Sequence, residues 1–193
     1  WMYNMRKYLL HVLIISFVLL CNFGCSNTSP VEIEEAKEEV RKNPDDAWAH
    51  LNLGFAYGIS GKHKEAIESC KQAIRIDPDD ADAHDFLGLT YAELGKYKEA
   101  IKSYKQALRI DPDHAEAHHD LGTAYIGLGK YEEAIEPFKQ AIRINPDYMN
   151  AHYNLACSYS LLGDVNKALE SLGRSIDLGF DDIEHLESDS DLN

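Results

Sequence analysis

A period of 34 residues runs through most of the chain and restricts its fold more than any other feature of the sequence. Each period ends in a proline and carries a glycine near its middle. The prolines are Pro44, Pro78, Pro112 and Pro146, and the glycines are Gly61, Gly95, Gly129 and Gly163. Repetition at this interval, with two helical segments in each period, is typical of a solenoid in which successive units stack.

The unit formed by residues 115–148 shows why each period should contain two helices. Leu121 and Tyr125 are one helical turn apart, and Ala134 and Phe138 repeat this spacing in the second half of the unit. The repeated glycine lies between the two segments, where it can adopt the left-handed conformation that ends a helix. The repeated proline ends the second segment because the residue before a proline is kept out of helical dihedrals. One pair of helices cannot bury its apolar face alone, so we expect neighbouring units to stack.

The residues shared by the units form a pattern, which in the second unit comprises Leu87-Gly88, Tyr91, Gly95, Glu99-Ala100-Ile101, Tyr104, Ala107 and Asp111-Pro112. This pattern resembles the tetratricopeptide repeat (TPR). The resemblance extends over residues 47–182 as four units, which are 47–80, 81–114, 115–148 and 149–182. It implies an all-α fold, a right-handed superhelical solenoid of antiparallel helix pairs.

Both ends of this array are predicted to be covered, as the exposed apolar faces of a solenoid require. Residues 26–46 should form a short tether and an N-terminal cap helix, in which Ile33 and Val40 face the first unit. Residues 183–193 should form a C-terminal cap helix and a polar tail, with Asp182 at the start of the helix.

The N-terminal segment resembles the signal of a bacterial lipoprotein. Arg6-Lys7 precedes an apolar run over residues 9–20, which is short for a membrane span, and Gly24-Cys25-Ser26 follows. The resemblance implies that residues 1–25 are a signal, that Cys25 is acylated, and that the repeats are exported. The protein would then be anchored on the extracytoplasmic side of a bacterial envelope, periplasmic or outer. An uncleaved signal anchor, plain secretion and a misread start of the chain are the alternatives.

Charge and motif content exclude several classes of function. The net charge is −14, with 33 acidic and 19 basic residues, which argues against nucleic acid as a partner because phosphate contacts need Lys and Arg. The sequence contains no Gly-rich phosphate loop, no paired-cysteine zinc motif and no nucleophile elbow. We therefore predict that the protein is not an enzyme and carries no cofactor.

Four histidines, His50, His84, His118 and His152, recur with the 34-residue period. Equivalent positions in stacked units lie about 10 Å apart, whereas the ligands of one zinc ion lie about 2 Å from it. The repeated histidines are therefore interpreted as packed side chains, and no metal site is predicted.

In the TPR family the first helix of each unit lines a concave groove. By register the groove would be apolar at the first unit and acidic in the middle. The predicted groove residues are Trp48, Leu51, Phe55, Asp82, Asp85, Leu89, Glu116, His119, Thr123, Asn150, Tyr153 and Cys157. None of them is Lys or Arg, so the groove does not match the TPR domains that clamp a carboxylate. An alternative for Trp48 and Phe55 is that the N-terminal cap helix covers them.

These features favour a non-enzymatic scaffold for protein–protein interaction, predicted to be a lipid-anchored adaptor in an envelope assembly. The expected partner is a protein or peptide with apolar anchors and some basic residues. The membrane would be contacted only through the lipid. The alternatives are a structural solenoid that associates with itself and the non-catalytic part of an envelope enzyme.

Overall fold

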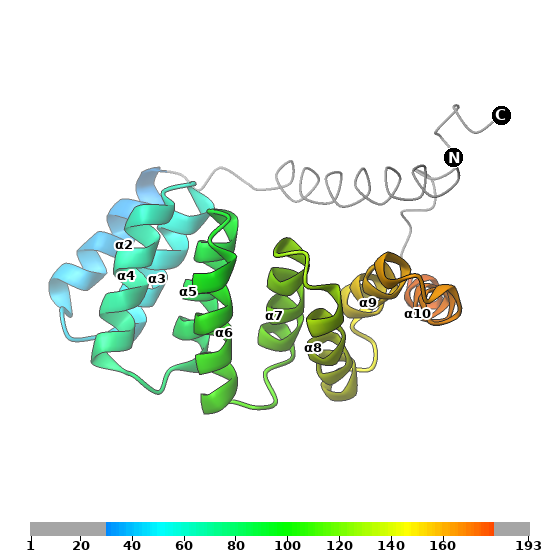
Figure 1. Ribbon diagram of the computed structural model, residues 1–193. Helices are drawn as coiled ribbons and strands as arrows, with labels where there is room; N and C mark the ends of the chain where they lie inside the picture. The colour runs from blue at the N-terminus through cyan, green and yellow to red at the C-terminus, as the bar shows by residue number, and fades with distance from the viewer. Residues whose placement is uncertain (1–29, 180–193) are drawn as a thin grey trace.

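The computed structural model describes residues 30–179, which form an all-α solenoid of nine helices in this part of the chain (Figure 1). This confirms the fold class predicted from the repeat. The helices are α2 Pro30–Lys42, α3 Ala47–Ile59, α4 His63–Ile76, α5 Ala81–Glu93, α6 Tyr97–Ile110, α7 Ala115–Gly127, α8 Tyr131–Ile144, α9 Met149–Leu162 and α10 Val165–Asp177. The predicted signal with Cys25 and the predicted C-terminal cap helix lie outside the described residues.

Consecutive helices pack in pairs, α3 with α4, α5 with α6, α7 with α8 and α9 with α10. The repeated glycine reverses the chain within each pair, with φ between 69° and 82° at Gly61, Gly95, Gly129 and Gly163. Glycine adopts this left-handed conformation at little cost because it has no Cβ. Each second helix also packs on the first helix of the next unit, so the pairs stack in sequence order.

In the second and third units, the two helices of the pair are in close contact through a glycine of the first and an aromatic ring of the second. A Cβ added to Gly88 would lie 2.6 Å from the ring of Tyr104, and a Cβ added to Gly122 would lie 2.7 Å from the ring of Phe138. Both rings are buried. The ring therefore packs directly on the backbone of the opposite helix.

The core is continuous from unit to unit. Tyr91 packs against the buried clusters of both the first and the second unit, and Tyr125 does the same for the second and third units. Because a single pair of helices does not enclose its own core, the stability of each unit depends on its neighbours.

The two ends of the described array differ. Helix α2 packs Ile33 against Leu53 and Ala56 of α3, and its outer face is charged. It begins at Pro30, inside the segment expected to be a tether. At the other end, α10 exposes Val165, Leu169 and Ile176, and Leu169 is 62% exposed.

Each of the four repeated histidines has the same role in the structure. Its Nε2 donates to the carbonyl oxygen of the proline six residues earlier, at distances of 2.9–3.1 Å. The pairs are His50 with Pro44, His84 with Pro78, His118 with Pro112 and His152 with Pro146. The histidine thus holds the turn that precedes its own helix. Within residues 30–179 no group of three His, Cys, Asp or Glu side chains could hold a metal ion.

The Gly88–Tyr104 contact predicts a loss of stability when Gly88 acquires a side chain. Gly88→Ala should lower the free energy of unfolding by about 1–3 kcal/mol, because the ring and the backbone must separate. Gly173→Ala is the matched control, since Gly173 lies within α10 with nothing near its Cβ position, and it should stabilise by about 0.5–1 kcal/mol. Urea unfolding of both variants measures these changes, and equal effects would contradict the proposed contact.

Candidate partner-binding surface

The first helices of the four units, α3, α5, α7 and α9, form one face of the solenoid. Each of these helices contacts the next one of the set, whereas the second helices are not in comparable contact with one another in residues 30–179. The array is therefore curved, with the first helices on its inner side. We call this side the concave face.

The concave face carries exposed apolar side chains at its N-terminal half. Trp48 and Phe55 of α3 and Leu89 of α5 are all exposed, and Trp48 is 61% exposed. The Phe55 ring lies 3.9 Å from the ring of Phe86, centroid to centroid, so it bridges the first two units. We call Trp48, Phe55 and Leu89 the apolar patch.

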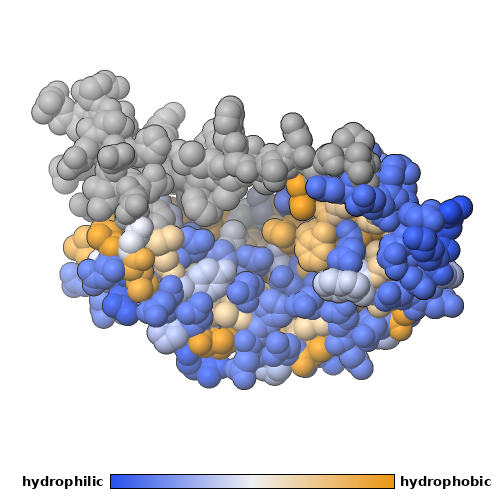
Figure 2. Space-filling model, turned by 180° about the vertical axis from the view of Figure 1, so that it is seen from behind, coloured by the Kyte–Doolittle hydropathy of each residue, from blue (hydrophilic) through white to orange (hydrophobic). Residues whose placement is uncertain are grey.

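Helix α2 does not cover this patch in the described part of the chain. It packs against Leu53, Ala56 and Tyr57, which occupy another side of α3. Figure 2 shows apolar side chains to the right of centre, over the first units, and at the left edge, the α9–α10 end, with further ones along the lower edge. Most of the surface between them is hydrophilic.

An acidic cluster lies next to the apolar patch, on α5 and α7. Its members are Asp82, Asp85, Glu116 and Asp120. Asp82 Oδ1 accepts a hydrogen bond from His114 Nε2 at 3.1 Å. His114 Nδ1 accepts from the backbone N–H of Ala117 and so caps α7. The backbone contact leaves the proton of His114 on Nε2, facing Asp82.

Asp120 is held by a buried histidine. The Nδ1–H of His119 donates to Asp120 Oδ1 at 2.9 Å, and His119 Nε2 accepts from Asn154 Nδ2 at 3.0 Å. One neutral tautomer satisfies both contacts. The His119 ring also packs against Tyr148, with 5.0 Å between the ring centroids. This network links the third unit to the fourth.

Asp85 differs from the other members of the cluster because its Oδ1 is buried and has no hydrogen-bond partner. Burial is the main cause that raises the pKa of Asp85 to about 7, and the charge of Asp120 is the next. Asp82 and Glu116 raise the pKa further, while His114 lowers it. At neutral pH the carboxyl is therefore close to half protonated.

The predicted groove residues lie at different depths. Six are exposed, namely Trp48, Phe55, Asp82, Leu89, Glu116 and Thr123, and four are half-buried, namely Asp85, Asn150, Tyr153 and Cys157. Leu51 and His119 depart from the prediction because they are only 1% and 9% exposed. Leu51 packs in the core with Ile67 and Cys70. These two side chains cannot present a surface to a partner.

Sequence reasoning missed one member of the cluster, Asp120, and the histidine hydrogen-bonded to the cluster, His114. Asp120 follows Glu116 by one helical turn, a spacing that puts both on the same side of α7. His114 takes the capping position held by Asp46 and Asp80 in the preceding units. The helical spacing and the repeat register were the signals that could have identified them.

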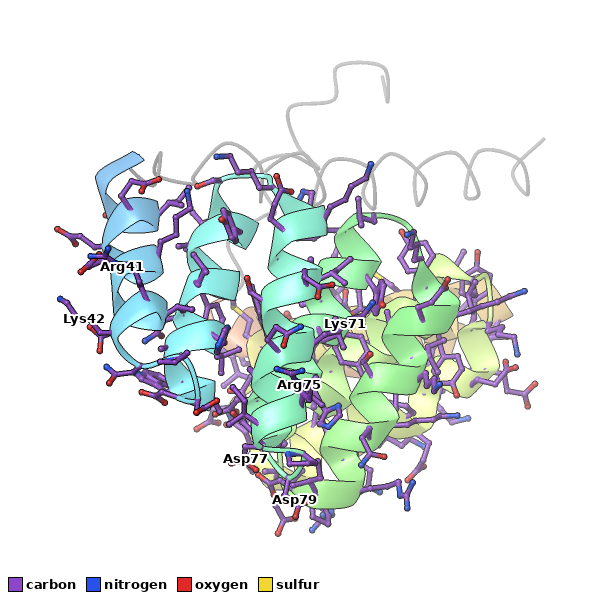
Figure 3. All side chains as sticks on the ribbon, turned by 90° about the vertical axis from the view of Figure 1, so that its left-hand side faces the viewer. Arg41, Lys42, Lys71, Arg75, Asp77 and Asp79 are labelled. Carbon is purple, nitrogen blue, oxygen red and sulfur yellow. The ribbon has the colours of Figure 1, made fainter. Side chains whose placement is uncertain are left out.

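Positive charge is absent from the concave helices. The segments α3, α5, α7 and α9 contain no Lys or Arg. Basic side chains lie on the other helices of the described residues, and Figure 3 shows Arg41 and Lys42 on α2 with Lys71 and Arg75 on α4. The helices of the concave face therefore place histidines near the acidic cluster but no Lys or Arg.

The lengths of the described helices bear on whether any of them could span a membrane. Each has 13 or 14 residues, and none within residues 30–179 combines the length and apolar character needed to cross a membrane.

The raised pKa of Asp85 predicts how Asp85→Asn changes stability. The unfolded chain loses this proton near pH 3.8, whereas the folded chain keeps it up to about pH 7, so the free energy of unfolding falls as the pH rises from about 4 to 7. Asp85→Asn should therefore be more stable than the parent at about pH 8, by on the order of 2 kcal/mol, and nearly equal at about pH 4. Urea unfolding across this range tests it, with Glu170→Gln on α10 as an exposed control. A constant difference at all pH values would contradict the burial of an ionisable Asp85.

Comparison with known protein families identifies the repeat. Models of the tetratricopeptide repeat match residues 47–80 and 150–179, and a TPR repeat model matches residues 88–129 and 122–163. Together they cover more than half of the chain. A model of anaphase-promoting complex subunit 5 matches residues 2–63, which is under half of the chain and assigns nothing further. No curated protein sequence matches the chain significantly.

Solved structures show the same fold. A crystal structure of MamA is 24% identical and has a TM-score of 0.72, covering 79% of this chain and 89% of that chain. A second MamA structure, from MSR-1, is 26% identical with a TM-score of 0.62, over 79% of this chain and 94% of that one. YrrB, described as a TPR protein with an unusual peptide-binding site, is 24% identical with a TM-score of 0.67, over 80% of each chain. The repeat matches and the helix-pair solenoid together show that the chain belongs to the tetratricopeptide repeat family.

Proposed function

We propose that the chain is a protein-binding scaffold whose concave face holds a segment of a partner protein. The observation that carries this proposal is the exposed apolar patch, Trp48, Phe55 and Leu89, directly beside the acidic cluster on the same face. Large apolar side chains beside polar groups on a concave surface are typical of protein recognition. YrrB, which shares the fold, is described as having a peptide-binding site.

The chemistry of the face defines the partner. The apolar patch favours aromatic or aliphatic anchors, and the acidic cluster favours basic side chains because it holds no Lys or Arg of its own. A partner segment with a free carboxylate or a phosphate would be repelled. We therefore infer a protein or peptide partner with apolar anchors and basic residues, and no nucleic acid.

A non-catalytic role fits the reactive groups of the described residues. Burial raises the pKa of the Cys70 thiol to about 12 and that of the Cys157 thiol to about 11, so both stay protonated and weakly nucleophilic. His114 caps a helix and His119 is hydrogen-bonded on both ring nitrogens. These side chains act within the fold and are not available as bases.

We also propose that the scaffold is an envelope adaptor anchored by lipid at Cys25. This proposal rests on the sequence alone, because Arg6-Lys7, the apolar run over residues 9–20 and Gly24-Cys25-Ser26 precede the described residues. Acyl chains contribute about 0.8 kcal/mol of membrane affinity per buried CH₂, so two or more give a stable anchor. The anchor would hold the repeats at the membrane surface on the extracytoplasmic side.

A second candidate function is self-association as a structural solenoid. The exposed residues Val165, Leu169 and Ile176 favour it, because they form an apolar stripe along α10 at the end of the described array. Such a stripe could contact a second copy of the chain. It lies on a different helix from the apolar patch, so variants can separate the two functions.

Loss of the apolar patch should abolish partner capture. The double variant Trp48→Ala with Leu89→Ala removes two exposed side chains. Leu169→Ala on α10 removes a third that is as exposed as Trp48 but lies outside the patch. In a crosslinked pull-down from native membranes, the double variant should lose the partner by at least tenfold, while Leu169→Ala retains it. Circular dichroism confirms that both stay folded. The opposite result, with loss only in Leu169→Ala, would reject the concave face and favour self-association if the captured chain is a second copy.

Acylation predicts that Cys25 determines membrane retention. Cys25→Ser should move the protein from the membrane fraction to the soluble fraction, and Cys21→Ser should leave it on the membrane. Fractionation with metabolic labelling by a fatty acid measures both changes. If Cys25→Ser stays in the membrane with an intact N-terminus, the uncleaved anchor is correct.

A further inference from the structure

The carboxyl of Asp85 has no function in the fold that the described contacts reveal. Asp82 accepts a hydrogen bond from His114, and Asp120 accepts one from His119. Glu116 is exposed to water. Asp85 Oδ1 alone has neither accessible surface nor a hydrogen-bond partner.

The groups around Asp85 are mostly acidic: three carboxylates raise the pKa of Asp85, and His114 lowers it. Asp82 lies on the same helix, Glu116 and Asp120 lie on α7, and His114 precedes α7. Two tyrosines, Tyr104 of α6 and Tyr148 before α9, complete the surroundings. Burial is the main cause that raises the pKa of both, and the charges of Asp120 and Asp85 raise it further. An ionised carboxyl here is unfavourable, because it is desolvated and faces like charges.

An apolar contact surface adjoins this carboxyl. Leu89 follows Asp85 by four residues on α5, which places their Cβ atoms about 6 Å apart on one side of the helix. Leu89 is exposed and belongs to the apolar patch. A segment that rests on Leu89 therefore passes within reach of Asp85. An extended segment advances about 3.3 Å per residue, so about two residues separate the two contacts.

We propose that Asp85 receives a lysine or arginine side chain of the partner, that an apolar residue about two positions away rests on the patch, and that Asp85 releases a proton as the cation binds. This inference rests on the proposed function and names the residue that selects the partner. The O–H bond of Asp85 breaks, its proton passes to the solvent, and the carboxylate remains paired with the cation. No other bond changes.

Proton release makes binding depend on pH in a defined direction. The free protein holds the proton below about pH 7, so the partner must displace it there, and above about pH 7 the carboxylate is already ionised. Affinity should therefore rise about tenfold between pH 6 and pH 8. His114, the nearest histidine, is hydrogen-bonded through both ring nitrogens in the free protein.

The test uses the full 193-residue chain and random dodecamer peptides selected by display at about pH 8. Selected peptides should carry Lys or Arg close to an apolar residue, and replacing Arg by its neutral analogue citrulline should weaken binding at least tenfold. Calorimetry in two buffers with different ionisation enthalpies should detect release of about one proton near pH 6.5. These measurements on the parent protein need no variant.

Variants then assign the effect to Asp85. Asp85→Asn should show the same affinity at pH 6 and pH 8, release no proton and lose the preference for Arg over citrulline. Glu170→Gln, an exposed carboxyl removed from α10, should behave as the parent. Thermal unfolding verifies that both variants are folded.

The outcomes separate this inference from the proposed function. Peptides that need Trp48 and Leu89 but show no preference for a basic residue, or the same pH dependence in Asp85→Asn, would overturn the role of Asp85 and leave the scaffold function in place. If no selected peptide depends on Trp48 and Leu89, the concave face is not the binding site, and both proposals fail together.

Discussion

The close packing of a second-helix side chain on a glycine of the first helix holds the first three units together, through Cys70 in the first unit and an aromatic ring in the second and third. At Gly88 and Gly122 any side chain would overlap the ring of Tyr104 or Phe138, so the two helices of a unit are held at short range. The proline turn that follows is held by the repeated histidine, whose Nε2 donates to the proline carbonyl. The histidine contact recurs in all four units with the 34-residue period, and each second helix then packs on the first helix of the next unit.

This stacking has a consequence for charge. Because α3, α5, α7 and α9 contact one another on the inner side of the curve, whatever they carry is concentrated on one face. They carry no Lys or Arg, and the middle pair brings Asp82, Asp85, Glu116 and Asp120 together. The basic residues of the second helices, such as Lys71 and Arg75, lie elsewhere (Figure 3). Carboxylates gathered on one face attract a cationic segment before contact and orient it as it binds.

The fold could be predicted from the sequence because the repeated glycines and prolines mark where each helix ends, and the 34-residue period indicates stacked pairs of helices. The depth of each groove residue could not. Leu51, Asp85, His119 and Tyr153 hold the same position in their units, yet Leu51 and His119 are buried and the other two are half-buried. The exposed fraction of a side chain depends on its contacts with the neighbouring units. His119 is buried by its hydrogen bonds with Asp120 and Asn154 and by its ring contact with Tyr148. Register predicts which residues share a face but not which of them a partner can touch.

That shared position also bears on why Asp85 is unusual. In the first unit the same position holds a core leucine, and in the third it holds a histidine with both ring nitrogens bonded, so the repeat itself has no need of a carboxylate there. Asp85 makes the folded chain less stable at neutral pH, since its buried oxygen has no partner and its neighbours are acidic. Partly buried ionisable groups that destabilise a fold are more often found at functional sites. Asp85 lies one turn from Leu89, where the apolar patch meets the acidic cluster. A cation bound there would pair with the buried carboxylate and offset the unfavourable free energy of its ionisation.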